Sequence, residues 1–287
     1  MKISELKSDF IRSLEGLYPA EEVQSFFNII TEKYLDLSRI EIALKPHFVV
    51  YPKVIQQYQE AVRRLKEFEP IQYILGETEF YNLIFKVNTQ TLIPRPETEE
   101  LVEWILTEKP IQEEKNNSLT ILDIGTGSGC IAISLAKNRK GAQVHALDIS
   151  PQAIAIAKQN AELNKVDVRF EQIDILQATS LPSSIQYDII VSNPPYVREL
   201  EKEQMQANVL QYEPATALFV SNEDPLIFYK AIVKLAKSSL KPNAMLFFEI
   251  NEHFGQELKK YLNEEGFRNI ELKKDIYGKD RMMKSEF

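Results

Sequence analysis

The chain has 287 residues, of which 44% are hydrophobic and 26% are charged, a composition typical of a soluble globular protein with one or two domains. Its formal net charge of −8 argues against non-specific binding to nucleic acid, because such binding needs Lys and Arg to replace counterions. The single cysteine, Cys130, excludes an intrachain disulfide and fits a reducing compartment. Residues 1–7 are polar and no long apolar run occurs, so we expect a cytoplasmic protein that has no membrane segment.

Residues 1 to about 70 show the apolar spacing of helices. Glycine is scarce there, as in a small helix bundle. The residues that recur at helical spacing are Ile3, Leu6, Phe10 and Leu14, then Val23, Phe26, Phe27 and Ile30, then Val54, Tyr58, Ala61, Val62, Leu65 and Phe68. No catalytic constellation is present, so we interpret residues 1–74 as a helical domain that docks the substrate.

The pattern changes to strand-like alternation after residue 75. Phe80, Leu83, Phe85 and Val87 predict two short strands around a turn near Tyr81, so residues 75–93 are predicted to form a hairpin linker. The next segment, residues 93–99, reads Ile-Pro-Arg-Pro-Glu-Thr-Glu. Proline and acidic residues favour a helix start, so a helix is expected to begin near residue 97.

Strands and helices alternate from about residue 119 onward. The predicted strands span residues 119–124, 143–147, 168–173, 185–192 and 244–250, with helices between them that include residues 151–163 and 226–237. Alternating β and α elements predict a doubly wound, mostly parallel sheet, within a domain that spans residues 94–287. Two tail strands, around residues 270–272 and 281–283, are expected to close one edge in antiparallel orientation.

A glycine-rich turn follows the first predicted strand and opens a helix. It reads Asp123-Ile-Gly125-Thr126-Gly127-Ser-Gly129. Glycines let the backbone approach a ligand closely, and a helix N-terminus offers free N–H groups. The spacing is G-x-G-x-G, which differs from the G-x-G-x-x-G of dinucleotide sites. A carboxylate at Asp123 would repel a pyrophosphate but can accept a hydrogen bond from an ammonium group.

Two further acidic residues stand at the ends of the next predicted strands. Asp148 lies about 20 residues beyond the glycines, where a carboxylate can bind ribose hydroxyls, and Asp174 can accept from an adenine amino group. The following residues, Ile149 and Ile175, are included in this predicted cofactor site. Together with the glycine turn, these strand ends predict an adenosine-containing cofactor that carries an amino acid, S-adenosylmethionine.

The fourth strand end carries Asn193-Pro194-Pro195-Tyr196, which we predict to be the catalytic segment, with Asn193 also included in the predicted cofactor site. Two consecutive prolines fix φ and remove two N–H donors, which leaves a rigid wall rich in acceptors. The Asn193 side-chain oxygen and the Pro194 carbonyl can each accept one hydrogen of a planar –NH2 group, and the Tyr196 ring can stack on that group. No histidine has company suitable for ligating a metal, so we predict no metal site.

The chain resembles the HemK/PrmC protein-glutamine N5-methyltransferases over nearly its whole length. The glycine turn paired with Asn-Pro-Pro-Tyr carries this resemblance, together with the segments 69–76, 92–99, 213–218 and 274–281. The block Ile-Pro-Arg-Pro-Glu-Thr-Glu is its specific part, because amino-methyltransferases of DNA share Asn-Pro-Pro-Tyr but not that block. The resemblance implies a Rossmann-like class I S-adenosylmethionine-dependent methyltransferase domain, a small N-terminal helical bundle and a hairpin linker.

The resemblance also implies a substrate and two further site residues. The substrate would be the glutamine in the Gly-Gly-Gln motif of class I peptide chain release factors, with S-adenosylhomocysteine as the second product. Arg95 and Glu97 would line the entrance to the cofactor or substrate. Two segments depart from the family pattern, because residues 219–224 and Asn251 stand where glycines usually occur. We expect these departures to affect local loop geometry more than chemistry.

Several functions stay open at this level. One alternative is a glutamine methyltransferase that acts on a ribosomal protein by the same chemistry. Another is a DNA adenine N6-methyltransferase, because adenine also presents a planar –NH2 group. The acidic charge and the lack of an evident DNA-reading region argue against DNA. A non-catalytic cofactor-binding adaptor is the remaining alternative. We expect a monomer that docks its protein substrate transiently, with no membrane and no direct nucleic acid contact.

Overall fold

The computed structural model describes residues 1–108, 119–181 and 185–287. The chain divides into two compact units, each described separately below. The first contains Met1–Gly76 and Gln206–Tyr212, and the second contains Glu77–Met205 and Glu213–Phe287. No helix among the described residues is both long and apolar enough to span a membrane.

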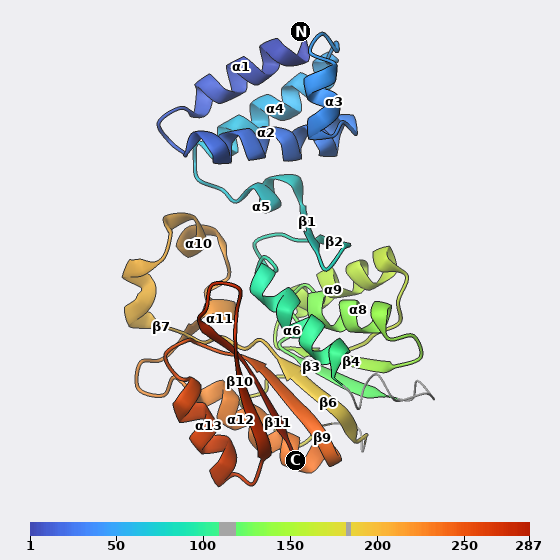
Figure 1. Ribbon diagram of the computed structural model, residues 1–287, viewed down its shortest axis with the longest axis vertical. Helices are drawn as coiled ribbons and strands as arrows, with labels where there is room; N and C mark the ends of the chain where they lie inside the picture. The colour runs from blue at the N-terminus through green and yellow to red at the C-terminus, as the bar shows by residue number, and fades with distance from the viewer. Residues whose placement is uncertain (109–118, 182–184) are drawn as a thin grey trace. The chain divides into compact units, whose positions relative to one another are not determined.

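The first unit is a helix bundle, as the apolar spacing predicts (Figure 1). Its helices are α1 (Ile3–Leu14), α2 (Ala20–Leu35), α3 (Arg39–Leu44), α4 (Pro52–Leu65), α5 (Ile71–Leu75) and α10 (Ala207–Tyr212). The rings of Phe10, Phe27 and Tyr58 meet in its core, and the Tyr58 hydroxyl donates to Thr31 Oγ1 at 2.6 Å. This bond satisfies the one polar group that the buried Tyr58 side chain carries.

Segment 206–212 joins this unit from far along the chain. The Tyr212 hydroxyl donates to the Glu67 carbonyl at 2.9 Å. Helical periodicity between residues 1 and 70 cannot predict that segment 206–212 joins this unit, because Tyr212 and Glu67 are 145 positions apart in the sequence.

The second unit is built on a mixed sheet in which seven strands of the described chain take part, in the order β10-β11-β9-β6-β3-β4-β5. The strands are β3 (Thr120–Ile124), β4 (Gln143–Asp148), β5 (Arg169–Gln172), β6 (Tyr187–Ser192), β9 (Leu240–Glu249), β10 (Arg268–Lys274) and β11 (Asp280–Glu286). Neighbours from β9 to β5 pair in parallel, while β11 pairs antiparallel with both β9 and β10. The predicted doubly wound sheet and its antiparallel tail are therefore confirmed.

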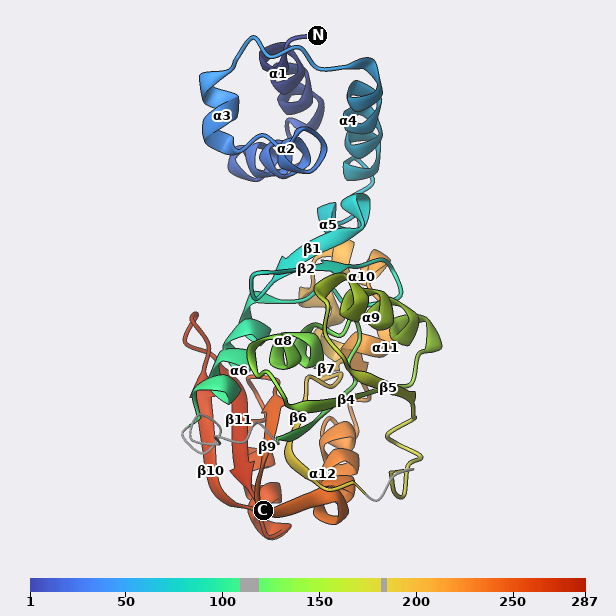
Figure 2. The same cartoon turned by 90° about the vertical axis from the view of Figure 1, so that its right-hand side faces the viewer.

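Helices cover both faces of the sheet, and Figure 2 shows α8 and α12 on opposite sides of it. The helices of this unit are α6 (Pro96–Thr107), α8 (Cys130–Asn138), α9 (Pro151–Asn164), α11 (Ala215–Leu218), α12 (Ile227–Ser239) and α13 (Gly255–Glu264), with a 3₁₀ segment, η1 (Glu199–Gln204). Successive strand residues alternate between the two cores: Ile121 packs with α6 and α8, and Leu122 packs with α12.

Two short pairs of strands complete the second unit. The predicted hairpin forms from β1 (Glu77–Phe80) and β2 (Leu83–Lys86), and its turn residues Tyr81 and Asn82 both have positive φ, 50° and 58°. That conformation matches the twist of a tight hairpin. The second pair is β7 (Val197–Arg198) with β8 (Phe219–Val220). It places the start of segment 219–224, where the family usually has glycines, beside the residues that follow Tyr196.

One strand boundary differs from its predicted position by several residues. β9 begins at Leu240, whereas the apolar run predicts a start at residue 244. Pro242 and Asn243 interrupt the apolar pattern there, and Asn243 has a φ of 63°. A local pattern cannot detect this extension, because it depends on pairing between Leu240 and Tyr187 in the neighbouring strand.

Candidate active site

The sheet places the glycine turn beside the Asn-Pro-Pro-Tyr segment. β3 and β6 are neighbours, and Ile124 pairs with Ser192 at their carboxyl ends. The Ser192 hydroxyl donates to the Ile124 carbonyl at 2.6 Å, and a Cβ added at Gly125 would lie 4.0 Å from the Asn193 carbonyl oxygen. This is the point where the strand order reverses, which is where open α/β sheets bind ligands.

The glycine turn needs its glycines for two different reasons. Gly127 has a φ of 55° with open space around an added Cβ, so a side chain there would be strained and would project into that space. Gly129 has a φ of 83°, and an added Cβ would meet Ile133 Cδ1 at 2.8 Å and Ala157 Cβ at 3.2 Å. Gly129 therefore lets α8 pack closely against α9, while Gly127 keeps backbone accessible.

Asp123 lies behind this turn. Its side chain is fully buried, and the Oδ2 atom accepts from Thr126 Oγ1 at 2.6 Å and from Ala132 N at 3.2 Å. The Oδ1 atom is buried without a hydrogen-bond partner among the described residues. Burial raises the pKa of Asp123 to about 7, with the hydrogen bonds from Thr126 and Ala132 acting in the opposite direction.

The raised pKa of Asp123 predicts a pH-dependent stability. Between about pH 4 and pH 7 the folded state holds a proton that the unfolded state has released, so the free energy of unfolding should fall by about 1.4 kcal/mol per pH unit from this group. Asp123→Asn should remove that slope. Urea unfolding followed by fluorescence of Trp104, the single tryptophan and a residue of the second unit, measures it at pH 5, 6 and 7. An unchanged slope in the variant would contradict the assignment.

Asp148 and Asp174 line one cavity of about 410 Å³ in the second unit. The two oxygens of Asp148 accept from Gly127 N at 2.8 Å and Ser150 N at 2.9 Å, and Asp174 Oδ1 accepts from Leu176 N at 2.9 Å. These bonds fix the carboxylates and still leave lone pairs for a ligand. The volume lies in the range of small-molecule sites.

The same cavity brings together most of the predicted site residues. The predicted residues on its wall are Gly125, Gly127, Asp148, Ile149, Asp174, Ile175, Asn193, Pro194 and Pro195. Asp123, Thr126 and Gly129 are buried residues of the glycine turn that do not line this wall. Tyr196 lines a smaller adjoining cavity, which shares Asn193 and Pro194 with the larger one.

The Asn193 side chain is held from α6. Its Nδ2 atom donates to Thr98 Oγ1 at 3.3 Å, and Thr98 Oγ1 donates to Glu249 Oε2 at 2.6 Å. The Tyr196 hydroxyl donates to the other oxygen of the same carboxylate, Glu249 Oε1, at 2.9 Å. Burial raises the pKa of Glu249, an effect that the two hydroxyl donors and the positive charge of Arg281 oppose.

Sequence reasoning missed Thr98 and Glu249 as site residues. Glu249 is the penultimate residue of a predicted buried strand, and an acidic residue near a strand end is the signal that identified Asp148 and could have identified Glu249 too. Thr98 lies within the Ile-Pro-Arg-Pro-Glu-Thr-Glu block, but no local pattern indicates that its hydroxyl reaches Asn193, 95 residues away.

Asn251 also holds the catalytic segment. Its Nδ2 atom donates to the Tyr196 carbonyl at 3.0 Å and to Glu201 Oε2 at 3.1 Å, and its Oδ1 atom accepts from His253 N at 3.0 Å. A glycine at this position could make none of these bonds. The departure at residue 251 therefore adds a side-chain brace behind Tyr196.

Arg95 forms an ion pair rather than standing free at the entrance. Arg95 Nη2 donates to Glu213 Oε1 at 2.6 Å, and the Glu213 side chain is only 1% exposed. Ile93 N donates to the second oxygen of Glu213 at 3.4 Å. Arg95 lines the smaller cavity, whereas Glu97 is half-buried in the first turn of α6 and lines neither cavity.

The two partners of this ion pair should differ in their effect on stability. Arg95→Met leaves a buried carboxylate without its cation and should cost about 3 kcal/mol. Glu213→Gln keeps an acceptor for Arg95, which is 33% exposed and can be hydrated, so it should cost about 1 kcal/mol. Urea unfolding of both variants, followed by Trp104 fluorescence, compares them. An equal loss of unfolding free energy in the two variants would contradict this prediction.

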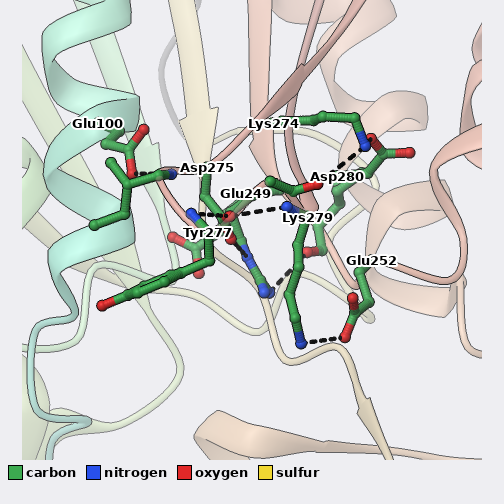
Figure 3. Close-up of polar contacts among 12 residues, drawn as sticks. Glu100, Glu249, Glu252, Lys274, Asp275, Tyr277, Lys279 and Asp280 are labelled. Atoms are coloured by element: carbon green, nitrogen blue, oxygen red, sulfur yellow. Dashed lines mark hydrogen bonds and ion pairs between the residues drawn. The ribbon is translucent and has the colours of Figure 1, made fainter.

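A turn joins β10 and β11 and is connected through Arg281 to the Ile250 carbonyl, which follows β9; Figure 3 shows polar contacts of this turn. Asp275 Oδ1 accepts from Tyr277 N and Lys279 N, and Asp275 Oδ2 accepts from Arg281 Nε at 3.1 Å. Glu100 accepts from the Ile276 N–H at 3.0 Å, which connects the turn to α6. The turn therefore holds Arg281 in a fixed place beside the end of β9.

Comparison with known proteins places this site in a family. The Methyltransferase small domain model matches residues 106–276, and the PrmC N-terminal domain model matches residues 7–76. The release factor glutamine methyltransferase of Flavobacterium psychrophilum is 50% identical over 288 residues, which cover 100% of both chains. That of Bacteroides thetaiotaomicron is 43% identical over 272 residues, 95% of each chain.

Solved structures agree on the fold. The catalytic domain of hMettl16 superposes with a TM-score of 0.55 at 16% identity, covering 82% of this chain and 81% of that one. A methyltransferase from Pyrococcus furiosus gives a TM-score of 0.51 at 16% identity, covering 72% and 90%. The resemblance drawn from the sequence motifs is confirmed, and the chain belongs to the release factor glutamine methyltransferase family.

Proposed function

We propose that this chain transfers a methyl group from S-adenosylmethionine to the side-chain N5 of the glutamine in the Gly-Gly-Gln motif of class I peptide chain release factors. The observation that carries the reaction is the shared wall of the cavity, where Asp148 and Asp174 meet Asn193 and Pro194. The substrate class is supported by full-length relatives that are named release factor glutamine methyltransferases.

The cavity residues fit this cofactor. Each oxygen of Asp148 accepts one backbone N–H and keeps capacity for a ribose hydroxyl. Gly127 leaves open space beside the backbone, and Ile149, 55% exposed, offers an apolar surface for a base. When bound, S-adenosylmethionine supplies a methyl group on a positively charged sulfur.

The chain contributes orientation to the reaction. Asn193 Oδ1 and the Pro194 carbonyl would accept the two hydrogens of the substrate amide and aim its nitrogen at the methyl carbon. The nitrogen gains the methyl group and loses one hydrogen as a proton. An amide nitrogen is a weak nucleophile because its lone pair is delocalised, so positioning is expected to dominate, a contribution that can reach about 7–11 kcal/mol. Acceptor dipoles would also stabilise positive charge that develops on the nitrogen.

The helical unit would dock the release factor, with residues 1–74 as the docking domain and residues 75–93 as the linker. The match of residues 7–76 to the PrmC N-terminal domain model supports a distinct module there. In this proposal Arg95 acts through Glu213, because their ion pair ties the segment before α6 to the segment around Pro214, and both segments line the cavities.

One labelling experiment tests the function. The protein is incubated with methyl-labelled S-adenosylmethionine and, separately, with a purified class I release factor, a ribosomal protein preparation and duplex DNA. We expect label in the release factor alone, lost when Gly-Gly-Gln is changed to Gly-Gly-Asn. Label only in ribosomal protein or DNA would overturn the substrate assignment, and label in none would favour an adaptor.

A further inference from the structure

The orientation of the Asn193 amide is a problem that the catalytic segment does not solve by itself. The oxygen and the –NH2 group of a carboxamide have nearly the same shape, so a 180° flip of the side chain keeps its packing. The flip would replace the acceptor that the proposed reaction needs by a donor. Some other group must therefore distinguish the two orientations.

The single hydroxyl hydrogen of Thr98 and the acceptor-only carboxylate of Glu249 make that distinction. A carboxylate can only accept, so Thr98 must use its single hydroxyl hydrogen on Glu249 Oε2, at 2.6 Å. The remaining lone pairs of Thr98 Oγ1 can only accept. Asn193 must then turn its Nδ2 toward Thr98, at 3.3 Å, which leaves Oδ1 as the acceptor of a side chain that lines both cavities.

We propose that Thr98 and Glu249 are positioning residues that hold Asn193 Oδ1 toward the substrate amide, an inference that rests on the proposed function. The chain of bonds starts on a rigid base, because Thr98 is 2% exposed and Glu249 is 1% exposed. Both oxygens of Glu249 are engaged, by Thr98 and by Tyr196. One buried carboxylate thus orients two residues of the catalytic segment.

The arrangement requires Glu249 to stay ionised; burial raises its pKa, and the positive charge of Arg281, near the start of β11, opposes that effect. Arg281 lies beside the end of β9, where its carbonyl accepts from Ile250 N at 2.8 Å, and Asp275 holds its guanidinium. The charged and titratable groups around Glu249 are Arg281 from β11, Glu97 from α6, Cys130 from α8, Tyr196 from the catalytic segment and Tyr229 from α12. Arg281 is the cation in this set, which gives a role to a tail segment that the cofactor and amide motifs leave unexplained.

Removal of the Thr98 hydroxyl tests the proposal. Thr98→Val keeps the shape of the side chain, frees Asn193 to flip and should lower kcat about 10- to 100-fold, while KM for release factor and the affinity for S-adenosylhomocysteine stay within about threefold. Thr98→Ser keeps the hydroxyl and should restore most of kcat. Thr107→Val makes the same change at the exposed end of α6 and serves as the matched control.

A second variant guards against loss of folding in Thr98→Val. Glu249→Gln removes a buried charge while keeping its shape, so the variant should fold. Its –NH2 group deprives either Thr98 or Tyr196 of an acceptor, so kcat should again fall by at least about tenfold. A well-folded Glu249→Gln protein with the wild-type kcat would overturn the proposal.

A measurement without turnover separates this inference from the proposed function. The side-chain –NH2 signal of Asn193, identified by its absence in Asn193→Ala, should exchange slowly with solvent in the wild type and in Thr98→Ser, and faster in Thr98→Val. Equal exchange rates in all three proteins would overturn the proposal even if release factor is methylated. Failure of the wild type to methylate release factor would instead overturn the proposed function.

Discussion

Replacement of Asn193 by Ala should abolish most turnover and leave cofactor binding nearly unchanged. The variant loses one of the two acceptors proposed to hold the amide, and loss of a comparable preorganised hydrogen-bonding group costs about 10²–10³-fold in kcat. Cofactor affinity should persist because Asp148 ends β4 and Asp174 follows β5, whereas Asn193 follows β6. Single-turnover methylation and calorimetry with S-adenosylhomocysteine measure the two effects separately.

The control for this variant is Asn263→Ala, on the exposed surface of α13. It should match the wild type in both assays. If Asn193→Ala retained turnover within a few-fold of the wild type, the role given to Asn193 would be wrong. A parallel loss of turnover and cofactor affinity would instead place Asn193 in cofactor binding.

Replacement of Asp148 by Ala should produce the opposite pattern, a large loss of cofactor affinity. The carboxylate is proposed to accept two ribose hydroxyls, and it also fixes Gly127 N at 2.8 Å and Ser150 N at 2.9 Å. Loss of two charge-assisted bonds, each worth about 1.5 kcal/mol, corresponds to about 100-fold weaker binding. Calorimetric titration with S-adenosylhomocysteine reports the dissociation constant directly.

Asp167→Ala is the matched control, because Asp167 is an exposed aspartate between α9 and β5. Its affinity should equal that of the wild type. Unaltered affinity in Asp148→Ala would remove Asp148 from the cofactor site. At saturating cofactor, Asp148→Ala should recover a substantial part of kcat, whereas Asn193→Ala should not, because the amide cradle is intact only in the former.

Local sequence patterns predict most of the helices and strands and the fold class. Helical spacing in residues 1–70, β/α alternation after residue 119 and the turn at Tyr81 are local properties, because each depends on residues a few positions apart. The acidic residues and the asparagine at the ends of the predicted strands could also be identified from the sequence. Parallel strands bring their carboxyl ends to one edge, so strand prediction alone places Asp148, Asp174 and Asn193 at that edge, and in the structure the three residues line one cavity.

The contacts that hold those residues in place are long-range and could not be predicted from local sequence patterns. Thr98 meets Glu249 across 151 positions, and Arg95 meets Glu213 across 118, contacts that depend on which strands neighbour each other and on how α6 crosses the sheet. Periodicity contains no such information. It also cannot tell that Asp123 is buried outside the cavity wall while Asp148 lines it, because burial is a property of the packed layers and not of the residue type.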